Sequence, residues 1–292
     1  MKDFLVGRNR IRFYGWASLV TQILIVVTGG AVRLTGSGLG CPTWPECKPG
    51  SLVNVPELGI HGFIEFANRL LTFVLLIVAI LTFVTVLLLD KVERKGKFWT
   101  SLALGLGIFA QAVIGGITVL TGLNSWVVGA HFVVSAVLIV IATILLWHCY
   151  ATKTVATSGL TRLASLALFP VGMVSIVLGV IVTGAGPHAG DSNTPRNGLD
   201  IDILAHLHSY PGYLMLILVV LQIILLKRNQ MRIRTSIFLL ITLIFQALIG
   251  ITQTRLGLPI ELVALHMFGA AVLCSLITWQ QLYRGIWRSA NA

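Results

Sequence analysis

Long apolar stretches alternate with short polar segments along the whole chain. Eight of the stretches are long enough to cross a bilayer as a helix, which takes about 20 residues. They cover residues 13–33, 62–89, 99–121, 127–149, 163–185, 204–226, 235–253 and 262–283. The pattern therefore predicts an all-α integral membrane protein with eight transmembrane helices.

Composition agrees with this prediction, because 56% of the residues are hydrophobic and only 11% are charged, whereas about a quarter are charged in soluble domains. The net charge of +11 would otherwise suggest a nucleic-acid-binding protein. However, all but five of the 21 basic residues (Arg33, Lys48, Arg69, Arg196 and Arg255) fall on one side of the predicted spans. By the positive-inside rule that side is cytoplasmic. We therefore expect lipid rather than nucleic acid around the protein, with both termini on the cytoplasmic side of the plasma membrane.

The chain contains an internal repeat. Residues 109–138 match residues 245–273, and the interval from glutamine to histidine is 20 residues in both, from Gln111 to His131 and from Gln246 to His266. Each half holds four spans, so the halves point the same way, as in a parallel duplication. We expect two parallel-repeat four-helix bundles, residues 1–150 and 163–292, joined by a cytoplasmic linker at 151–162.

Histidines recur toward the outer ends of the spans in both halves. His131 and His266 occupy matched positions of the repeat, while His61 opens the second span of one half and His206 and His208 open that of the other. Facing histidines in a four-helix bundle can hold haem iron, whereas a buried histidine bonded to a neighbouring helix would be structural. His206 and His208 lie about 200° apart on a helix, so only one faces inward. We favour His208, because its depth in the span is close to that of His266.

Other polar residues gather on the same outer side. Glu65 and Arg69 are one turn apart in the second span, where ionised side chains are costly and mark functional sites. A carboxyl group in an apolar pocket can exchange protons near neutrality, so Glu65 is a candidate catalytic residue. The alternative is a structural ion pair with Arg69. Arg33 and Arg255 are placed to bind carboxylates such as haem propionates, or else are interface arginines facing solvent or lipid.

Cys41 and Cys47 bracket the sequence CPTWPEC in the first outer loop. Outside the cytoplasm such an exposed, closely spaced pair is usually oxidised. A metal site is disfavoured because no third or fourth ligand lies nearby in the loop. Cys149 and Cys274 fall within spans and are interpreted as small apolar residues of the core.

Together these motifs resemble the haem A synthase family. The similarity is carried by TGGAVRLTGSGLGCPTWPEC at 28–47, IEFANR at 64–69, two Q-A-x-x-G segments at 111–115 and 246–250, and the GAHF and ALHM segments, and it covers nearly the whole chain. The resemblance implies an oxidoreductase that converts the C8 methyl group of haem O to a formyl group by successive hydroxylations, giving haem A for cytochrome oxidase.

The resemblance also implies how the work is divided between the halves. The amino-terminal half would hold the substrate haem and the carboxy-terminal half a haem b that relays electrons, with His131, His208 and His266 as iron ligands. The loop disulfide would assist haem handling, and haem O synthase, a farnesyltransferase, would donate the substrate. The electron donor, the oxygen source and a homo-oligomeric state are left open.

One position departs from the family pattern. The usual motif is Glu-x-x-His-Arg, whereas this chain has Asn68 between Glu65 and Arg69. His61 lies on the same helical face, and we expect it to take over ligation of the substrate haem. Since the seven residues from His61 to Asn68 span about 10 Å along a helix, the alternative is a substrate haem held by His131 alone.

Two other functions are compatible with parts of the sequence. A diheme cytochrome b that passes electrons from quinol to an outer partner would explain the histidines, but not Glu65 or the cysteine loop. A transporter built on a repeat would explain the duplication. Transporter sites, however, usually lie near the middle of the membrane on broken helices, whereas these histidines cluster toward one side.

Overall fold

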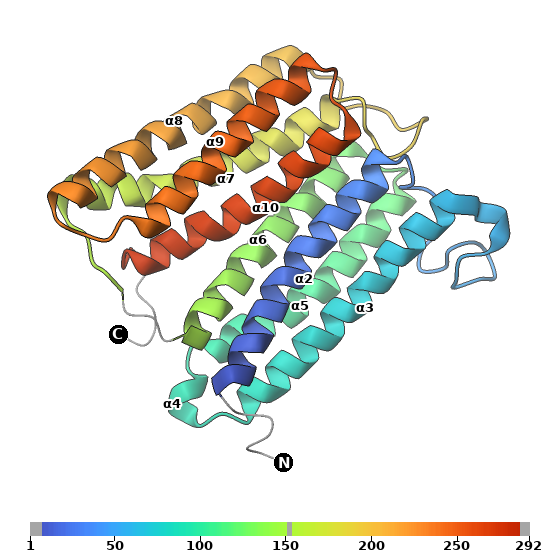
Figure 1. Cartoon of the computed structure of the whole chain (residues 1–292). Coiled ribbons are helices and arrows are strands. Elements are labelled where there is room, and N and C mark those ends of the chain that lie inside the picture. The colour runs from blue at the N-terminus through green and yellow to red at the C-terminus, as the bar shows by residue number, and fades with distance from the viewer. Residues whose placement is uncertain (1–7, 151–153, 287–292) are drawn as a thin grey trace.

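The structure, a computed structural model, describes residues 8–150 and 154–286. In this part of the chain all long elements are helices, and eight of them are long and apolar enough to cross a membrane. They are α2 (Arg8–Leu34), α3 (Gly59–Leu87), α5 (Lys97–Leu120), α6 (Ser125–Tyr150), α7 (Gly159–Ala185), α8 (Ile201–Arg228), α9 (Arg234–Arg255) and α10 (Ile260–Tyr283) (Figure 1). Two short helices, η1 (Pro56–Leu58) and α4 (Lys91–Arg94), lie in the connections. The predicted fold class, an all-α multi-pass membrane protein, is confirmed.

Each predicted span corresponds to one of these helices, and the boundaries differ by a few residues. Helix α7 begins at Gly159, four residues before the predicted start, and so takes up the end of the predicted linker at 151–162. This extra turn is stable because Thr161 packs inside the bundle, where it is 4% exposed. Residues 151–153 of the linker and the two termini lie outside the described residues.

The eight helices form two groups of four (Figure 1). In the first group α2 contacts α3 and α6, and α5 contacts the same two helices. In the second group α7 contacts α8 and α10, and α9 contacts the same two helices. The groups meet where α10 packs on α2 and α6, and where α6 packs on α7. This arrangement is consistent with the predicted pair of parallel four-helix bundles.

The turn between the third and fourth helix has the same backbone geometry in both halves. A leucine follows a glycine and has a positive φ, 60° at Leu123 and 63° at Leu258, which is uncommon for a residue with a side chain. The leucine N–H donates to the carbonyl five residues earlier, at Thr118 (2.8 Å) or Gln253 (2.7 Å). Because the two leucines are separated by the same interval as the two repeat histidines, the local backbone follows the sequence repeat.

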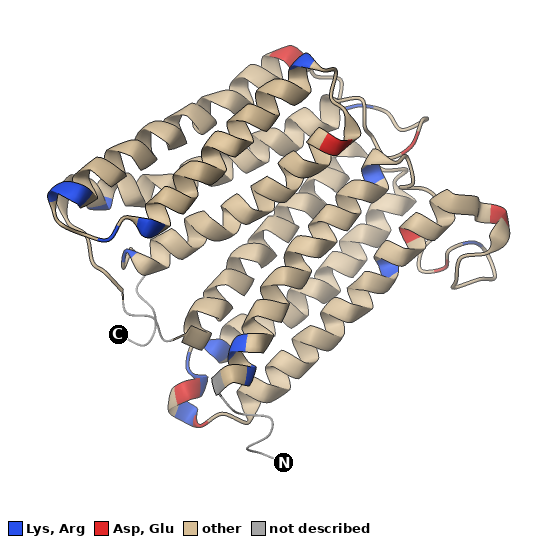
Figure 2. Ribbon diagram, in the orientation of Figure 1, with Lys and Arg blue, Asp and Glu red and all other residues tan. Residues whose placement is uncertain are grey.

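Charged residues separate toward the two ends of the helices (Figure 2). Lys and Arg gather where α2 begins, where α10 ends, around α4 and at the turn between α8 and α9, whereas most Asp and Glu lie at the opposite end. We call these the basic end and the loop end, since the long loop at 35–58 belongs to the second. The predicted cytoplasmic location of the basic end rests on the positive-inside rule.

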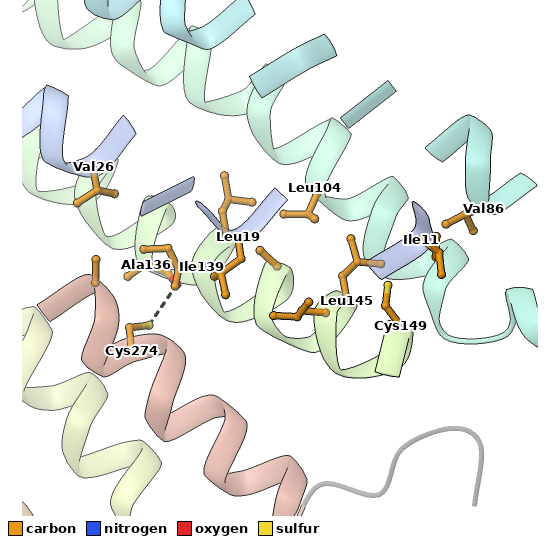
Figure 3. Close-up of a cluster of buried hydrophobic side chains, with 14 of the residues drawn as sticks. Ile11, Leu19, Val26, Val86, Leu104, Ala136, Ile139, Leu145, Cys149 and Cys274 are labelled. Atoms are coloured by element: carbon orange, nitrogen blue, oxygen red, sulfur yellow. Dashed lines mark hydrogen bonds between the residues drawn. The ribbon is translucent and has the colours of Figure 1, made fainter. Parts of the chain in front are cut away.

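A continuous apolar core runs through the amino-terminal bundle and into α10 (Figure 3). Ile139 and Leu145 of α6 are at most 1% exposed. Cys274 of α10 donates its thiol to the carbonyl of Ala136 at 3.6 Å, across the boundary between the halves. Cys149 and Cys274 are both free and buried, in agreement with their predicted place in the core.

The carboxy-terminal bundle contains a buried polar network toward its basic end. Gln222 of α8 donates to Ser165 of α7 at 2.6 Å, and it accepts from Ser236 of α9 at 2.9 Å and from Gln280 of α10 at 2.8 Å. All four side chains are at most 1% exposed. In the repeat, Gln280 corresponds to the apolar Leu145 of α6, so the amino-terminal bundle has a different core at this depth.

Candidate functional site

His208 of α8 and His266 of α10 face each other in the carboxy-terminal bundle. Their ring centroids are 6.1 Å apart and their planes are inclined by 80°. His208 Nδ1 lies 2.9 Å from the carbonyl oxygen of Ser175 in α7. A carbonyl oxygen can only accept, so Nδ1 carries the proton and Nε2 of His208 is the nitrogen available to a metal.

His266 is held by its backbone and by a close glycine. Gln246 Nε2 donates to the His266 carbonyl at 2.9 Å, and a Cβ added to Gly250 would lie 3.4 Å from Cε1 of the ring. Nδ1 of His266 is buried and has no hydrogen-bond partner among the described residues. His208 has a similar seat, because a Cβ on Gly179 would lie 2.9 Å from its Cε1. A side chain larger than that of glycine at Gly250 or Gly179 would therefore press on the His266 or the His208 ring.

The paired rings fit the axial ligands of a haem. A metal bound to both rings would need a bond of about 2.0 Å to a nitrogen on either side, and the centroid separation of 6.1 Å leaves room for one such atom. Imidazoles in an apolar helix bundle are common donors to haem iron. His206 is exposed, and its Nδ1 bonds to the carbonyl of Asp202 in its own helix at 2.7 Å. The structure thus brings His208, rather than His206, to His266.

His131 of α6 has the same surroundings as His266. Gln111 Nε2 donates to the His131 carbonyl at 3.0 Å, and a Cβ on Gly115 would lie 3.3 Å from Cε1. Nδ1 of His131 is also buried without a partner in the described part of the chain. The Gln-Ala-x-x-Gly motif therefore positions one histidine in each half, a role that the sequence did not reveal. His131 fits as an iron ligand of the amino-terminal half.

Asn68 of α3 faces the first helix of its half, as His208 does in the other half. It accepts a hydrogen bond from Thr28 of α2 at 2.7 Å. His61 is exposed at the start of α3, and its Nδ1 lies 2.9 Å from the hydroxyl of Ser37 in the loop. Among the described residues no ring contact like that of the carboxy-terminal pair joins His61 to the amino-terminal site. Ligation by His61 stays a prediction.

Arg33 joins the two halves at the loop end. Its Nε donates to the carbonyl of His188 at 2.6 Å and its Nη2 to that of Thr183 at 2.8 Å, so the end of α2 is tied to α7 and the loop after it. The sequence did not indicate this contact. Arg255 is exposed at the end of α9. Propionate binding by Arg33 and Arg255 stays a prediction.

Cys41 and Cys47 form a disulfide, as predicted. Residues 41–47, the disulfide loop, dock on α3 through Arg69. Its Nη2 donates to the carbonyls of Cys41 and Thr43, both at 3.0 Å, and its Nη1 to that of Glu46 at 3.2 Å. One side chain thus holds three carbonyl groups of a loop that has little regular structure of its own.

Glu65 completes this attachment. Its Oε1 accepts from Nη2 and Nε of Arg69 at 2.6 and 3.1 Å, and its Oε2 accepts from the N–H of Cys41 at 2.7 Å. The Glu65 side chain is only 7% exposed. The ion pair proposed as the structural alternative is therefore present, while proton exchange by Glu65 stays a prediction.

A comparison with known protein families decides the relationship. Residues 12–278 match the family described as cytochrome oxidase assembly protein. The chain belongs to this family.

Several curated proteins that are similar to this chain carry the name Heme A synthase. One from Lysinibacillus sphaericus is 37% identical over 129 residues, or 44% of this chain and 41% of the relative. One from Geobacillus thermodenitrificans is 28% identical over 151 residues (51% and 46%), and one from Macrococcus caseolyticus is 29% identical over 185 residues (58% and 57%). The chain thus spans about half the length of the curated relatives it matches.

Proposed function

We propose that this family member oxidises the C8 methyl group of haem O to a formyl group and so produces haem A for cytochrome oxidase. The observation that carries the proposal is the contrast between the halves. One half has a pair of facing histidines, and the other has His131 with Asn68 in the place of the second ligand. The name Heme A synthase, borne by the relatives, supports the reaction.

The carboxy-terminal pair is suited to a resident haem b. His208 and His266 would both hold its iron, because their rings face each other across the bundle. When bound, haem b supplies one-electron transfer. The proton of His208 Nδ1 is fixed by the carbonyl of Ser175, so the tautomer needed for ligation is set before the cofactor binds.

The amino-terminal site is suited to a haem that enters, reacts and leaves. His131 would be a protein ligand of this haem, whereas Asn68, whose side-chain oxygen accepts from Thr28, would not be one. With His61 as the proposed second ligand, we expect His61→Ala to lower haem occupancy of this half, while Asn68→Ala, the matched control, leaves it unchanged. Haem content measured by absorbance would decide, since unchanged occupancy in His61→Ala would leave His131 as the single protein ligand.

The overall reaction consumes oxygen, electrons and protons. With dioxygen as the oxidant, each hydroxylation takes up one dioxygen, two electrons and two protons, inserts one oxygen atom into a C–H bond and releases one water. A second hydroxylation gives a geminal diol, which loses water to leave the formyl group. Glu65 is the proposed proton-exchanging group, and Arg69 holds its carboxylate in place.

A Glu65→Gln variant tests this role. The amide keeps the shape of the side chain and removes the titrating proton, so we expect the variant to keep its haem and to lose most of the conversion. Purified protein would be incubated with haem O and a reductant, and the extracted haems separated by chromatography. Glu57→Gln, which removes an exposed carboxylate, is the control. Full conversion by Glu65→Gln would leave only the ion-pair role.

The same extraction tests the proposed reaction against its alternatives. Haem A formed by the parent protein would support the synthase. If haem O is recovered unchanged beside b-type haem, the diheme cytochrome becomes the better hypothesis, and a protein without haem would favour the transporter. The cellular setting is part of the proposal: a plasma-membrane protein in lipid with its basic end in the cytoplasm, supplied by haem O synthase.

A further inference from the structure

Trp44 lies at the centre of the disulfide loop, between Cys41 and Cys47. The loop is held on α3 by the three carbonyl contacts of Arg69 and by the bond from the Cys41 N–H to Glu65. With both ends joined by the disulfide and the backbone fixed from one side, the position of the Trp44 ring is determined by the fold.

The Trp44 ring rests on Gly116 of α5. A Cβ added to Gly116 would come within 2.9 Å of Cε3 of the indole and closer still to two other ring atoms, so only glycine admits the ring here. The preceding residue, Gly115, faces His131 in the same way. Trp44 and His131 therefore lie against the same turn of α5, one from the loop and one from α6.

In the described residues of the carboxy-terminal half, no aromatic side chain occupies the corresponding position. In the repeat, Gly250 matches Gly115 and keeps its contact with His266, whereas Ile251 matches Gly116 and is 44% exposed. The loop between α7 and α8, residues 186–200, contains neither cysteine nor tryptophan. The packing of a tryptophan on a helix glycine therefore occurs in the half where the proposed reaction takes place. It is not repeated in the half proposed to keep its haem.

We propose that Trp44 is a contact residue of the substrate haem, closing the loop side of the amino-terminal site and slowing escape of the macrocycle. The inference rests on the proposed function. Trp44 is 38% exposed, so it is available for contact, and aromatic rings stack favourably on flat conjugated systems. In the competing interpretation Trp44 anchors the loop at the membrane interface, as interfacial tryptophans often do.

Haem retention distinguishes the two interpretations without relying on turnover. Purified protein loaded with haem O would be mixed with excess apomyoglobin, and the transfer of haem followed by absorbance. His266→Ala, which lacks the carboxy-terminal pair, identifies the phase that belongs to the amino-terminal site. We expect Trp44→Ala to accelerate that phase about tenfold and to leave the other phase unchanged.

Two further variants protect the test against a folding defect. Trp44→Phe keeps an aromatic ring and should retain haem nearly as the parent does, while Gly116→Ile copies the carboxy-terminal half and should lose haem as Trp44→Ala does. Trp126→Ala removes an exposed tryptophan at the start of α6 and should change neither phase.

Two results would overturn the inference: an unchanged amino-terminal phase in Trp44→Ala, or equal acceleration of both phases, which would indicate general damage. Either result in a protein that makes haem A would leave the proposed function standing. A parent protein that binds haem in both halves but forms no haem A would instead refute the proposed function, while the retention of haem could still be compared.

Discussion

Replacement of His266 by alanine is expected to remove the low-spin haem of the carboxy-terminal half completely. The His266 ring faces His208 at 6.1 Å, and its place is fixed by Gln246 and Gly250. Without one imidazole the proposed haem would lose one of its two protein ligands, and alanine offers no donor to replace it. Visible absorption and electron paramagnetic resonance spectra of the purified variant would show the loss.

His206→Ala is the matched control for this experiment. His206 is two residues from His208 but is exposed and bonded to its own helix, so its removal should leave the low-spin spectrum intact. An unchanged low-spin signal in His266→Ala would show that the facing rings are not the ligands. Loss of the signal in both variants would point to a less specific effect on the bundle.

Replacement of Arg69 by leucine is expected to destabilise the protein by about 3–5 kcal/mol, because it leaves the buried Glu65 carboxylate without its partner. The variant also loses three hydrogen bonds to the disulfide loop. Denaturant unfolding of the purified protein in detergent would measure the change. Lys48→Met removes one partner of an exposed ion pair with Glu57, and it should have little effect, since exposed pairs contribute little.

A double variant separates the charge effect from the loss of contacts. Glu65→Gln in the Arg69→Leu background removes the unpaired charge, so part of the lost stability should return. Simple additivity of the two substitutions would contradict the buried-pair explanation. It would mean that Arg69 stabilises the protein only through its contacts with the loop carbonyls.

The apolar pattern predicted the helices well, because a membrane span needs a minimum length and few charges, and both can be counted along the chain. The choice between His206 and His208 also followed from the sequence, since helical periodicity allows only one of them to face inward and the depth of His208 in its span is close to that of His266. The disulfide was predictable because two cysteines lie so close together in one outer loop. These features depend on local order in the chain, which the sequence displays directly.

Contacts between distant segments were not predictable in the same way. The sequence suggested that Arg33 binds an anion, and in the structure two of its donors also bond to carbonyl groups near the end of α7. Every residue has a backbone carbonyl, so the amino-acid sequence does not show which carbonyl an arginine will contact. The docking of the disulfide loop on Arg69 was missed for the same reason. The bond between His61 and Ser37 of the loop was likewise not predicted, and ligation by His61 remains to be tested.

The polar network of the carboxy-terminal bundle fixes how its helices can move. Ser165, Gln222, Ser236 and Gln280 come from four different helices, so sliding one helix past another would strand polar groups away from water. At the matched depth the amino-terminal bundle has Leu145, and an apolar contact can be exchanged for a similar one when helices shift. The polar network thereby fixes the register of the carboxy-terminal helices, whereas the amino-terminal helices are freer to shift. This difference suits a bundle proposed to keep its haem beside a bundle proposed to take up and release its substrate haem.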